Sequence, residues 1–224
     1  EVSKNTLIYG GLQVIFTTVL GLACAMIANS HRNRCKGLFK VSMFYPYIFP
    51  WTVAAMVWMY MFHPTRGIIN ALFGLRIQWL NSYDITLYAL VLVSVWKTMG
   101  FNFLIFLSGL QSIPQELYQA ADLETSSGWK KFCHITLPML SPTTFMAVLL
   151  SIVGSFQSVD LIYIMTQGRP GNSTNTLIYY IYQQGITSWN IGYGSALSTV
   201  LFGALLVITV VYIVVGEKGV NYER

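Results

Sequence analysis

Two ionisable residues lie inside apolar runs of this sequence and are the first candidates for chemistry. Lys97 falls near the middle of the run Ile85–Leu110, and Asp160 falls in the outer half of the run Met139–Met165. A charged side chain at membrane depth costs at least about 2.5 kcal/mol, so it normally faces a bundle interior or water. Two interpretations are open: Lys97 and Asp160 pair with each other, or both line a path through the membrane.

The side chains around these two residues are a mixture of polar and aromatic types. Sugar hydroxyls need hydrogen-bond partners, and the C–H faces of a sugar ring pack on aromatic side chains, so such a mixture favours a carbohydrate path. The candidate path residues are Trp96, Lys97, Thr98, Phe101 and Asn102 on the earlier run, and Ser155, Gln157, Ser158 and Asp160 on the later one.

Catalytic chemistry is not indicated by the sequence. His31, His63 and His134 are scattered between segments on opposite sides of the predicted membrane, so they cannot converge on a metal or an acid–base site. The sequence contains no GxxxxGK[ST] phosphate-binding loop, so ATP chemistry would have to come from other subunits. The scattered cysteines match neither a metal site nor a disulfide framework. We expect no enzyme activity, no catalytic residues, no cofactor and no metal.

Long apolar segments are the elements that must position the candidate residues. Apolar residues make up 54% of the chain and charged residues 9%, against about 25% charged residues in a soluble domain. Five runs are long enough to cross a bilayer, which takes about 20 residues. The sequence therefore predicts an all-α, polytopic helical membrane protein in which residues 1–224 form a single transmembrane domain. The expected spans are Thr6–Ala28, Val41–Phe62, Ile85–Leu110, Met139–Met165 and Ile191–Val215.

Local signals refine two of these regions. Pro46 and Pro50 predict a kink in the second span, because a proline removes a backbone donor from the helix. Between the second and third spans, the stretch Gly67–Gly74 predicts a short apolar helix at the surface.

Basic residues set the expected orientation. Eight lie in the segments 30–40 and 111–138 and in the tail, whereas four lie in the intervening segments. Basic loops are enriched on the cytoplasmic side, so these segments and the C-terminus are expected inside. Glu1 would then begin outside without a signal segment, which predicts a preceding span absent from this chain. The basic residues that give the chain its net charge of +5 lie beside the spans rather than in one patch, so nucleic acid is not an expected partner.

The polar segment 111–138 is the most unusual connection in the chain, since ordinary connections are about 4–6 residues long. Ile113-Pro114 and Leu137-Pro138 mark probable helix boundaries at its two ends. Within it, Glu116–Glu124 predicts one short helix and Trp129–Thr136 a second, with a turn at residues 126–128. A folded polar loop of this length favours a docking surface for a soluble protein, although a loop lying along lipid headgroups is the alternative.

This segment resembles the cytoplasmic EAA loop of permease subunits of bacterial ATP-binding-cassette importers. That pattern contains Glu-Ala-Ala, then Asp-Gly three residues on, and later Phe, Ile, Leu-Pro and Pro. Gln119 replaces its Glu, and Glu124-Thr125 replaces its Asp-Gly. Further similarities in both outer segments are greatest to the carbohydrate and glycerol-phosphate branch. The residues in register with the loop pattern are Ala120, Ala121, Phe132, Ile135, Leu137, Pro138 and Pro142.

The resemblance implies a permease subunit that forms the path for a sugar or related polyol. It implies that the first loop helix enters a cleft of an ATPase subunit. The implied partners are a second, different permease subunit, two ATP-binding subunits, an extracellular solute-binding protein and the lipid bilayer of a bacterial cell membrane. The implied coupling residues are Tyr118, Gln119, Ala120, Ala121, Glu124, Thr125 and Gly128.

An ion-gradient-driven secondary transporter is the alternative function. That class often contains inverted repeats and several buried acidic residues at helix breaks. Here Asp160 is nearly alone within the apolar runs, and no repeat is visible.

Overall fold

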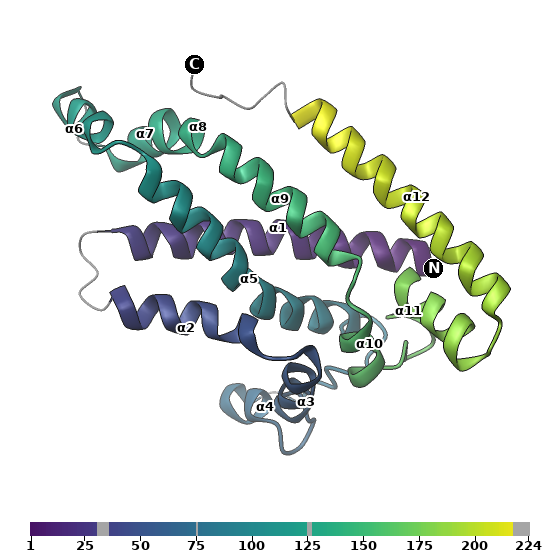
Figure 1. Cartoon of the computed structure of the whole chain (residues 1–224). Coiled ribbons are helices and arrows are strands. Elements are labelled where there is room, and N and C mark those ends of the chain that lie inside the picture. Colours follow the sequence, from purple (N-terminus) through teal and green to yellow (C-terminus); the bar gives the residue numbers. More distant parts are fainter. Residues whose placement is uncertain (31–35, 75, 125–126, 217–224) are drawn as a thin grey trace.

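The computed structural model describes residues 1–30, 36–74, 76–124 and 127–216, and every regular element in these ranges is a helix. Helices α1 (Val2–Asn29) and α5 (Thr86–Ser112) cross at the centre of the molecule. Helix α2 (Lys36–Ile48) packs on α5, and α9 (Ser141–Ser155) packs on both α1 and α5. The long helix α12 (Ile191–Gly216) lies at the outside beside α9 (Figure 1). The predicted all-α membrane fold is confirmed.

Small residues allow α1 and α5 to approach each other closely. Gly10, Thr17, Gly21 and Ala25 are all buried on one face of α1. A Cβ atom added at Gly21 would lie only 2.9 Å from the Cβ of Asn102 on α5. Packing of small residues in this way is how membrane helices associate without a hydrophobic driving force between them.

The second predicted span is interrupted at Pro50. Helix α2 ends at Ile48, and α3 (Trp51–Met61) begins directly after Pro50. Proline has no N–H to donate and disfavours a helical conformation of the residue before it, which explains the interruption at Phe49. Pro46, by contrast, remains inside α2. The two prolines therefore produce one interruption rather than a kink at each.

The fourth predicted span is also interrupted, and the expected continuous helix over Met139–Met165 is wrong. Helix α9 ends at Ser155, and α10 (Val159–Met165) starts only after the non-helical residues 156–158. Non-helical backbone at membrane depth is tolerated where it lines a cavity, which is the situation found here. Within the described ranges, three single helices are long and apolar enough to span a membrane: α1, α5 and α12. The expected number of five spans is therefore not confirmed.

The connecting elements gather at the two ends of the bundle. Helix α4 (Ile68–Phe73) lies between Gly67 and Gly74, which confirms the predicted short helix; Gly74 has φ 63°, the left-handed conformation that favours glycine. Helix α11 (Leu177–Tyr182) and the π-helix η2 (Gln183–Thr187) lie toward the same end. The loop elements between α5 and α9 lie at the opposite end, together with the end of α1 (Figure 1).

The end of α12 lies beside the start of α9. The Tyr212 hydroxyl donates a hydrogen bond of 3.2 Å to the carbonyl oxygen of Phe145, and the two rings stack with centroids 5.0 Å apart. The C-terminal end of α12 is therefore on the same side of the bundle as the loop elements that precede α9 (Figure 1).

Candidate functional site

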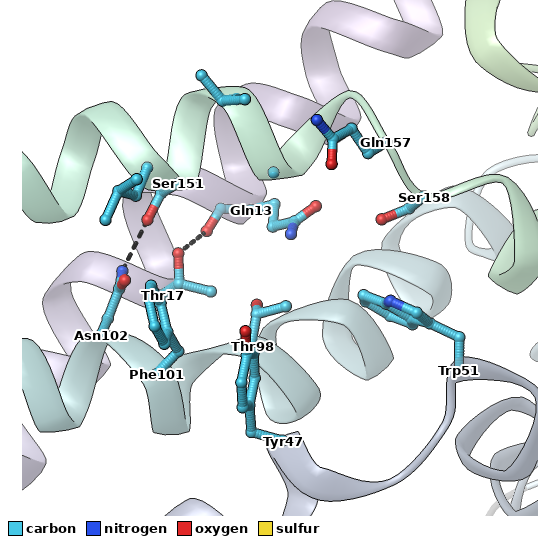
Figure 2. A pocket seen from close by; sticks show the side chains of 13 residues that line it. Gln13, Thr17, Tyr47, Trp51, Thr98, Phe101, Asn102, Ser151, Gln157 and Ser158 are labelled. Carbon is cyan, nitrogen blue, oxygen red and sulfur yellow. Dashed lines mark hydrogen bonds between the residues drawn. The ribbon is translucent and has the colours of Figure 1, made fainter.

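A pocket of about 380 Å³ lies at the two helix interruptions, in the middle of the bundle. Figure 2 shows that its labelled side chains come from α1, from both sides of the α2–α3 interruption, from α5, and from α9 and the residues after it. Each of these segments is separated from the others in sequence, so only the packing of the helices brings the side chains together. The residues that line the pocket are Gln13, Thr17, Tyr47, Trp51, Thr98, Phe101, Asn102, Leu150, Ser151, Val153, Gly154, Gln157 and Ser158.

Aromatic rings form one wall of the pocket. Tyr47 and Phe101 are stacked, with ring centroids 5.2 Å apart and an interplanar angle of 20°. Trp51 lies next to Tyr47 along this wall (Figure 2). Flat apolar faces of this kind pack well against the C–H faces of a ligand ring.

Polar side chains line the rest of the pocket, and one of them has an unpartnered oxygen. The Asn102 amide donates a hydrogen bond of 2.8 Å to the Ser151 hydroxyl. In contrast, the Gln13 side-chain oxygen is buried without a hydrogen-bond partner. Figure 2 shows the Gln13 amide extending toward Ser158, whose hydroxyl interacts with that of the buried Tyr9. Because buried polar atoms are normally hydrogen-bonded, the Gln13 oxygen is available to a polar ligand.

The described residues that line the pocket carry no charge. Hydroxyl and amide groups supply its hydrogen-bonding capacity, and aromatic and aliphatic groups supply the remainder. This arrangement is suited to binding an uncharged, hydroxyl-rich molecule, whereas an anion or cation would be desolvated there without an opposite charge.

Five of the nine residues expected to line a path do line this pocket: Thr98, Phe101, Asn102, Gln157 and Ser158. Trp96 instead packs edge-on against Trp58, with ring centroids 5.5 Å apart. The Ser155 hydroxyl donates a hydrogen bond to the carbonyl oxygen of Ile152 within α9, so its donor is already paired. The interruption after Ser155 separates it from Ser158, so the two serines do not contribute to the same wall.

Of the two interpretations of the charges, the ion pair between Lys97 and Asp160 is not found. Lys97 is buried and donates a hydrogen bond of 3.1 Å to the carbonyl oxygen of Tyr47. Asp160 is exposed in the first turn of α10, where a carboxylate interacts favourably with the helix dipole. Because the helix is interrupted at residues 156–158, Asp160 belongs to the separate helix α10. Its side chain therefore does not have the orientation that a continuous α9 would have given it.

Eight lining residues lie outside the predicted set: four belong to α9 (Leu150, Ser151, Val153 and Gly154), and the other four are Gln13, Thr17, Tyr47 and Trp51. Gln13 and Thr17 lie on α1 among small residues that indicate helix packing. Tyr47 and Trp51 lie beside Pro50. A helix interruption next to aromatic residues is a signal that could have placed Tyr47 and Trp51 in a cavity.

The loop before α9 forms a second candidate site. Helix α6 (Gln115–Glu124) follows Pro114 and confirms the first predicted loop helix. The second region consists of α7 (Gly128–Lys131), the π-helix η1 (Phe132–Thr136) and α8 (Leu137–Met139). The predicted boundary at Leu137-Pro138 coincides with the change from η1, which ends at Thr136, to α8, where the proline fits in the first turn. The chain then bends by 68° between the segments Gly128–Met139 and Ser141–Ser155.

Side-chain contacts hold α6 against the elements that follow it. The hydroxyl groups of Tyr118 and Thr136 are hydrogen-bonded at 2.9 Å. Lys131 and Asp122 form an ion pair. The loop is therefore a folded elbow whose two limbs are joined at two positions.

The expected coupling residues are distributed over this elbow. Gln119 and Ala120 are exposed, Ala121 is half-exposed, and Gly128 is exposed at the start of α7. Leu123 is 91% exposed, so α6 presents an apolar side chain to its surroundings. Glu124 is the last residue of α6, whereas Thr125 and the side chain of Glu124 lie outside the described part of the structure.

Residues 17–216 match the family described as the binding-protein-dependent transport system inner membrane component. The chain belongs to this family. It is therefore a membrane-embedded permease subunit and not an enzyme, because the family's ATPase activity lies in separate subunits.

Relatives of this permease transport several solutes. The sulfoquinovosyl glycerol transport system permease protein SmoG of Agrobacterium fabrum is 34% identical over 95% of this chain and 70% of its own length. The arabinooligosaccharides transport system permease protein AraP of Bacillus subtilis is 34% identical over 92% of this chain and 68% of its own length. The trehalose/maltose transport system permease protein MalF of Thermococcus litoralis is 33% identical, over 95% and 72% respectively.

Solved structures share the fold of this permease. A chain of a bacterial ABC transporter involved in the import of the acidic polysaccharide alginate superposes with a TM-score of 0.87 at 19% identity, over 97% of this chain and 78% of that one. A chain of the inward-facing MetNI methionine ABC transporter superposes with a TM-score of 0.68 at 14% identity, over 97% and 94%. The ion-gradient alternative finds no support among these relatives.

Proposed function

We propose that this permease subunit forms the path for an uncharged sugar or related polyol in an ATP-driven importer of the bacterial cell membrane. The observation that carries this proposal is the pocket itself. It combines the stacked rings of Tyr47 and Phe101 with the unpartnered side-chain oxygen of Gln13. The named solutes of SmoG, AraP and MalF all contain sugar units, which supports a carbohydrate as the class of solute.

In this proposal, the elbow couples movement of the ATPase subunits to the pocket. Helix α6 docks in a cleft of an ATPase subunit, with Gln119, Ala120 and Leu123 at the contact. When the ATPases close, α6 moves, and the contacts of Tyr118 and Lys131 transmit that movement to the segment that leads into α9. The pocket then changes its access from one side of the membrane to the other.

The proposed assembly contains this chain, a different second permease subunit, two ATP-binding subunits and an extracellular solute-binding protein. One solved relative is described as a complex with an alginate pentasaccharide-bound periplasmic protein, which supports a solute-binding protein as a partner. Residues 1–224 act as one permease domain, with the coupling loop at 111–138. In this proposal the elbow and the C-terminus lie in the cytoplasm, because α12 ends at the same end of the bundle as the elbow and the sequence carries its densest basic residues in the segments 30–40 and 111–138.

The test is reconstitution of the whole importer in lipid vesicles with its solute-binding protein. We expect uptake of a radiolabelled sugar only when ATP is supplied on the side of the ATPases. Uptake that survives on a proton or sodium gradient without ATP would contradict the proposal. A screen of the solute-binding protein against sugars and sugar acids would identify the solute to use.

A further inference from the structure

Lys97 is a charged side chain in the interior of the bundle, and the path proposal leaves it without a role. Only 4% of the residue is exposed. It is not among the residues that line the pocket, and it forms no ion pair within the described ranges. Retaining a charge at this depth is costly unless it interacts favourably with its surroundings.

The hydrogen bond and the ring contacts of Lys97 are with residues on either side of the interruption between α2 and α3. Its Nζ atom lies 3.1 Å from the carbonyl oxygen of Tyr47. The same atom lies 5.4 Å from the centroid of the Tyr47 ring and 4.8 Å from that of the Trp51 ring. These distances are within the range at which an ammonium group is attracted to the face of an aromatic ring.

The carbonyl group that Lys97 contacts is one that needs a donor. Tyr47 lies in the last turn of α2, where carbonyl oxygens have no partner within the helix. Pro50 follows the interruption and has no N–H to offer. A cation at the C-terminal end of a helix also interacts favourably with the helix dipole. Lys97, which is on the neighbouring helix α5, therefore supplies a hydrogen-bond donor to a carbonyl group at the end of α2.

The packing of α5 on α2 directs Lys97 to this position. Gly100 lies three residues after Lys97, and therefore on nearly the same face of α5. A Cβ atom added at Gly100 would lie only 2.5 Å from the carbonyl oxygen of Met43 on α2. The two helices are in close backbone contact there, one turn away from Lys97, which brings the Lys97 side chain beside the last turn of α2.

The residues that Lys97 contacts are the same residues that form the aromatic wall of the pocket. Tyr47 and Trp51 both line it, and Tyr47 stacks on Phe101. We propose that Lys97 is a positioning residue that joins the two halves of the interrupted span and holds the rings of Tyr47 and Trp51 in the wall of the solute pocket. The inference rests on the proposed function of that pocket.

A double-mutant cycle in the reconstituted importer tests this role. We expect Lys97→Met and Tyr47→Leu each to lower the rate of sugar uptake about tenfold, and the double variant to be slower than either one but by clearly less than the product of the two effects, because Tyr47→Leu removes the ring contact of Lys97 and leaves its carbonyl and Trp51 contacts. Lys97→Arg should stay within about threefold of the unchanged chain, because a guanidinium group also binds carbonyl groups and stacks on aromatic rings.

Gln157 supplies the matched control for the cycle. It lines the pocket from the α9–α10 interruption and has no contact with Lys97 among those described. Lys97→Met combined with Gln157→Ala should therefore lower uptake by about the product of the two single effects. Two results would overturn the assignment. One is a Lys97–Tyr47 double variant whose loss of uptake equals the product of the two single losses. The other is a Lys97→Arg variant as slow as Lys97→Met.

A labelling measurement separates this inference from the proposed transport function. Thr98→Cys places a thiol in the pocket of the assembled importer once Cys24, Cys35 and Cys133 are replaced by serine. We expect Lys97→Met to change the rate at which a membrane-impermeant thiol reagent labels Cys at position 98 by at least about threefold, and to have a smaller effect when Tyr47→Leu is already present, because the ring contact of Lys97 is then already lost. An unchanged labelling rate would overturn the role of Lys97, whereas failure of ATP-driven uptake alone would overturn only the transport proposal.

Discussion

Gln13 shows how a single side chain can be optimised for a ligand rather than for the fold. Its side-chain oxygen is buried in the pocket without a partner, which normally lowers the stability of a protein. A residue of this kind is retained where its polar group has another use. Gln13 is on α1, and its amide extends toward the α9–α10 interruption within the pocket proposed to hold the solute (Figure 2).

We therefore expect Gln13→Met to separate uptake from stability. Methionine is similar in size and removes the unpartnered oxygen, so the thermal midpoint of the purified importer should stay the same or rise. Uptake of the sugar should fall about tenfold, which corresponds to the loss of one good hydrogen bond of about 1.4 kcal/mol in the pocket. A variant with lower thermal stability and normal uptake would contradict this assignment.

Sequence reasoning identified the polar residues of the third span better than those of the first. Thr98, Phe101 and Asn102 stand out because polar and aromatic types adjoin a charged residue in an apolar run. Gln13 and Thr17 lie in a run rich in Gly, Ala and Thr, where a polar side chain is easily attributed to helix packing. Lys97 was correctly identified as unusual, but its partner is a backbone carbonyl group, which no pattern of side chains can reveal.

At the scale of the helices, the contact between α1 and α5 determines where the pocket residues lie. Gly21 on α1 adjoins Asn102 on α5, and Asn102 in turn bonds to Ser151 on α9. Three helices therefore meet at one level of the bundle. A change in the distance between α1 and α5 should affect both stability and the geometry of the pocket.

Two glycines of α1 provide a matched test of this contact. A Cβ atom at Gly21 would lie 3.1 Å from the backbone nitrogen of Phe103, whereas a Cβ atom at Gly11 would have no neighbour within 4 Å. We expect Gly21→Ala to destabilise the protein by about 1–3 kcal/mol, as overpacking does. Gly11→Ala should cause no loss, since alanine favours a helix. Thermal unfolding in detergent would measure both, and equal stabilities would contradict the packing argument.

Helix α6 leads to a different prediction, because its exposed face is expected to meet another protein. Ala120 is small and exposed, so a closely fitting cleft would exclude a large side chain at this position. We expect Ala120→Trp to abolish association with the ATPase subunit while insertion into the membrane remains normal. Co-purification with the ATPase measures this association.

Ala71→Trp on α4 is the control for that experiment. Ala71 is also exposed but lies at the opposite end of the bundle, so its replacement should leave co-purification unchanged. If the Ala120→Trp variant retained the ATPase as well as the Ala71→Trp variant does, α6 would not be the docking helix.

The helical elements were predictable to different degrees for physical reasons. Helices α4 and α6 are bounded by glycine or proline, which act locally and can be recognised in sequence. The α9–α10 interruption contains no proline that would mark it in the sequence. Its polar residues 157 and 158 line the pocket, which forms only when the helices pack together. Hydropathy is averaged over a whole apolar run, so three non-helical residues within the run do not change the average enough to be noticed. It therefore predicts one continuous span.

At the scale of the whole molecule, the two ends of the bundle are chemically different. One end carries the elbow, the end of α1 and the end of α12, whereas the other carries α4 and α11 (Figure 1). Lys130 and Lys131 of α7 lie at the first end. In the proposed orientation, this end faces the inside of the cell.

Cysteine labelling in intact cells tests this orientation. Leu123 on α6 is 91% exposed and Leu72 on α4 is 75% exposed, so each site is accessible to a reagent on its own side. With the natural cysteines replaced by serine, we expect Leu72→Cys to be labelled by an impermeant reagent from outside. Leu123→Cys should react only after the membrane is opened. The reverse pattern would contradict the proposed topology.

The sparse packing of α12 has a consequence for how this protein must be produced. Only Gly194 and Leu201 of this 26-residue helix are buried, although the helix is the most apolar of the three long ones. In a cell that makes this chain without its companions, most of α12 would contact lipid alone, and proteases that remove orphan subunits would compete with assembly. Simultaneous synthesis of the companion subunits is therefore the condition under which intact chain should accumulate.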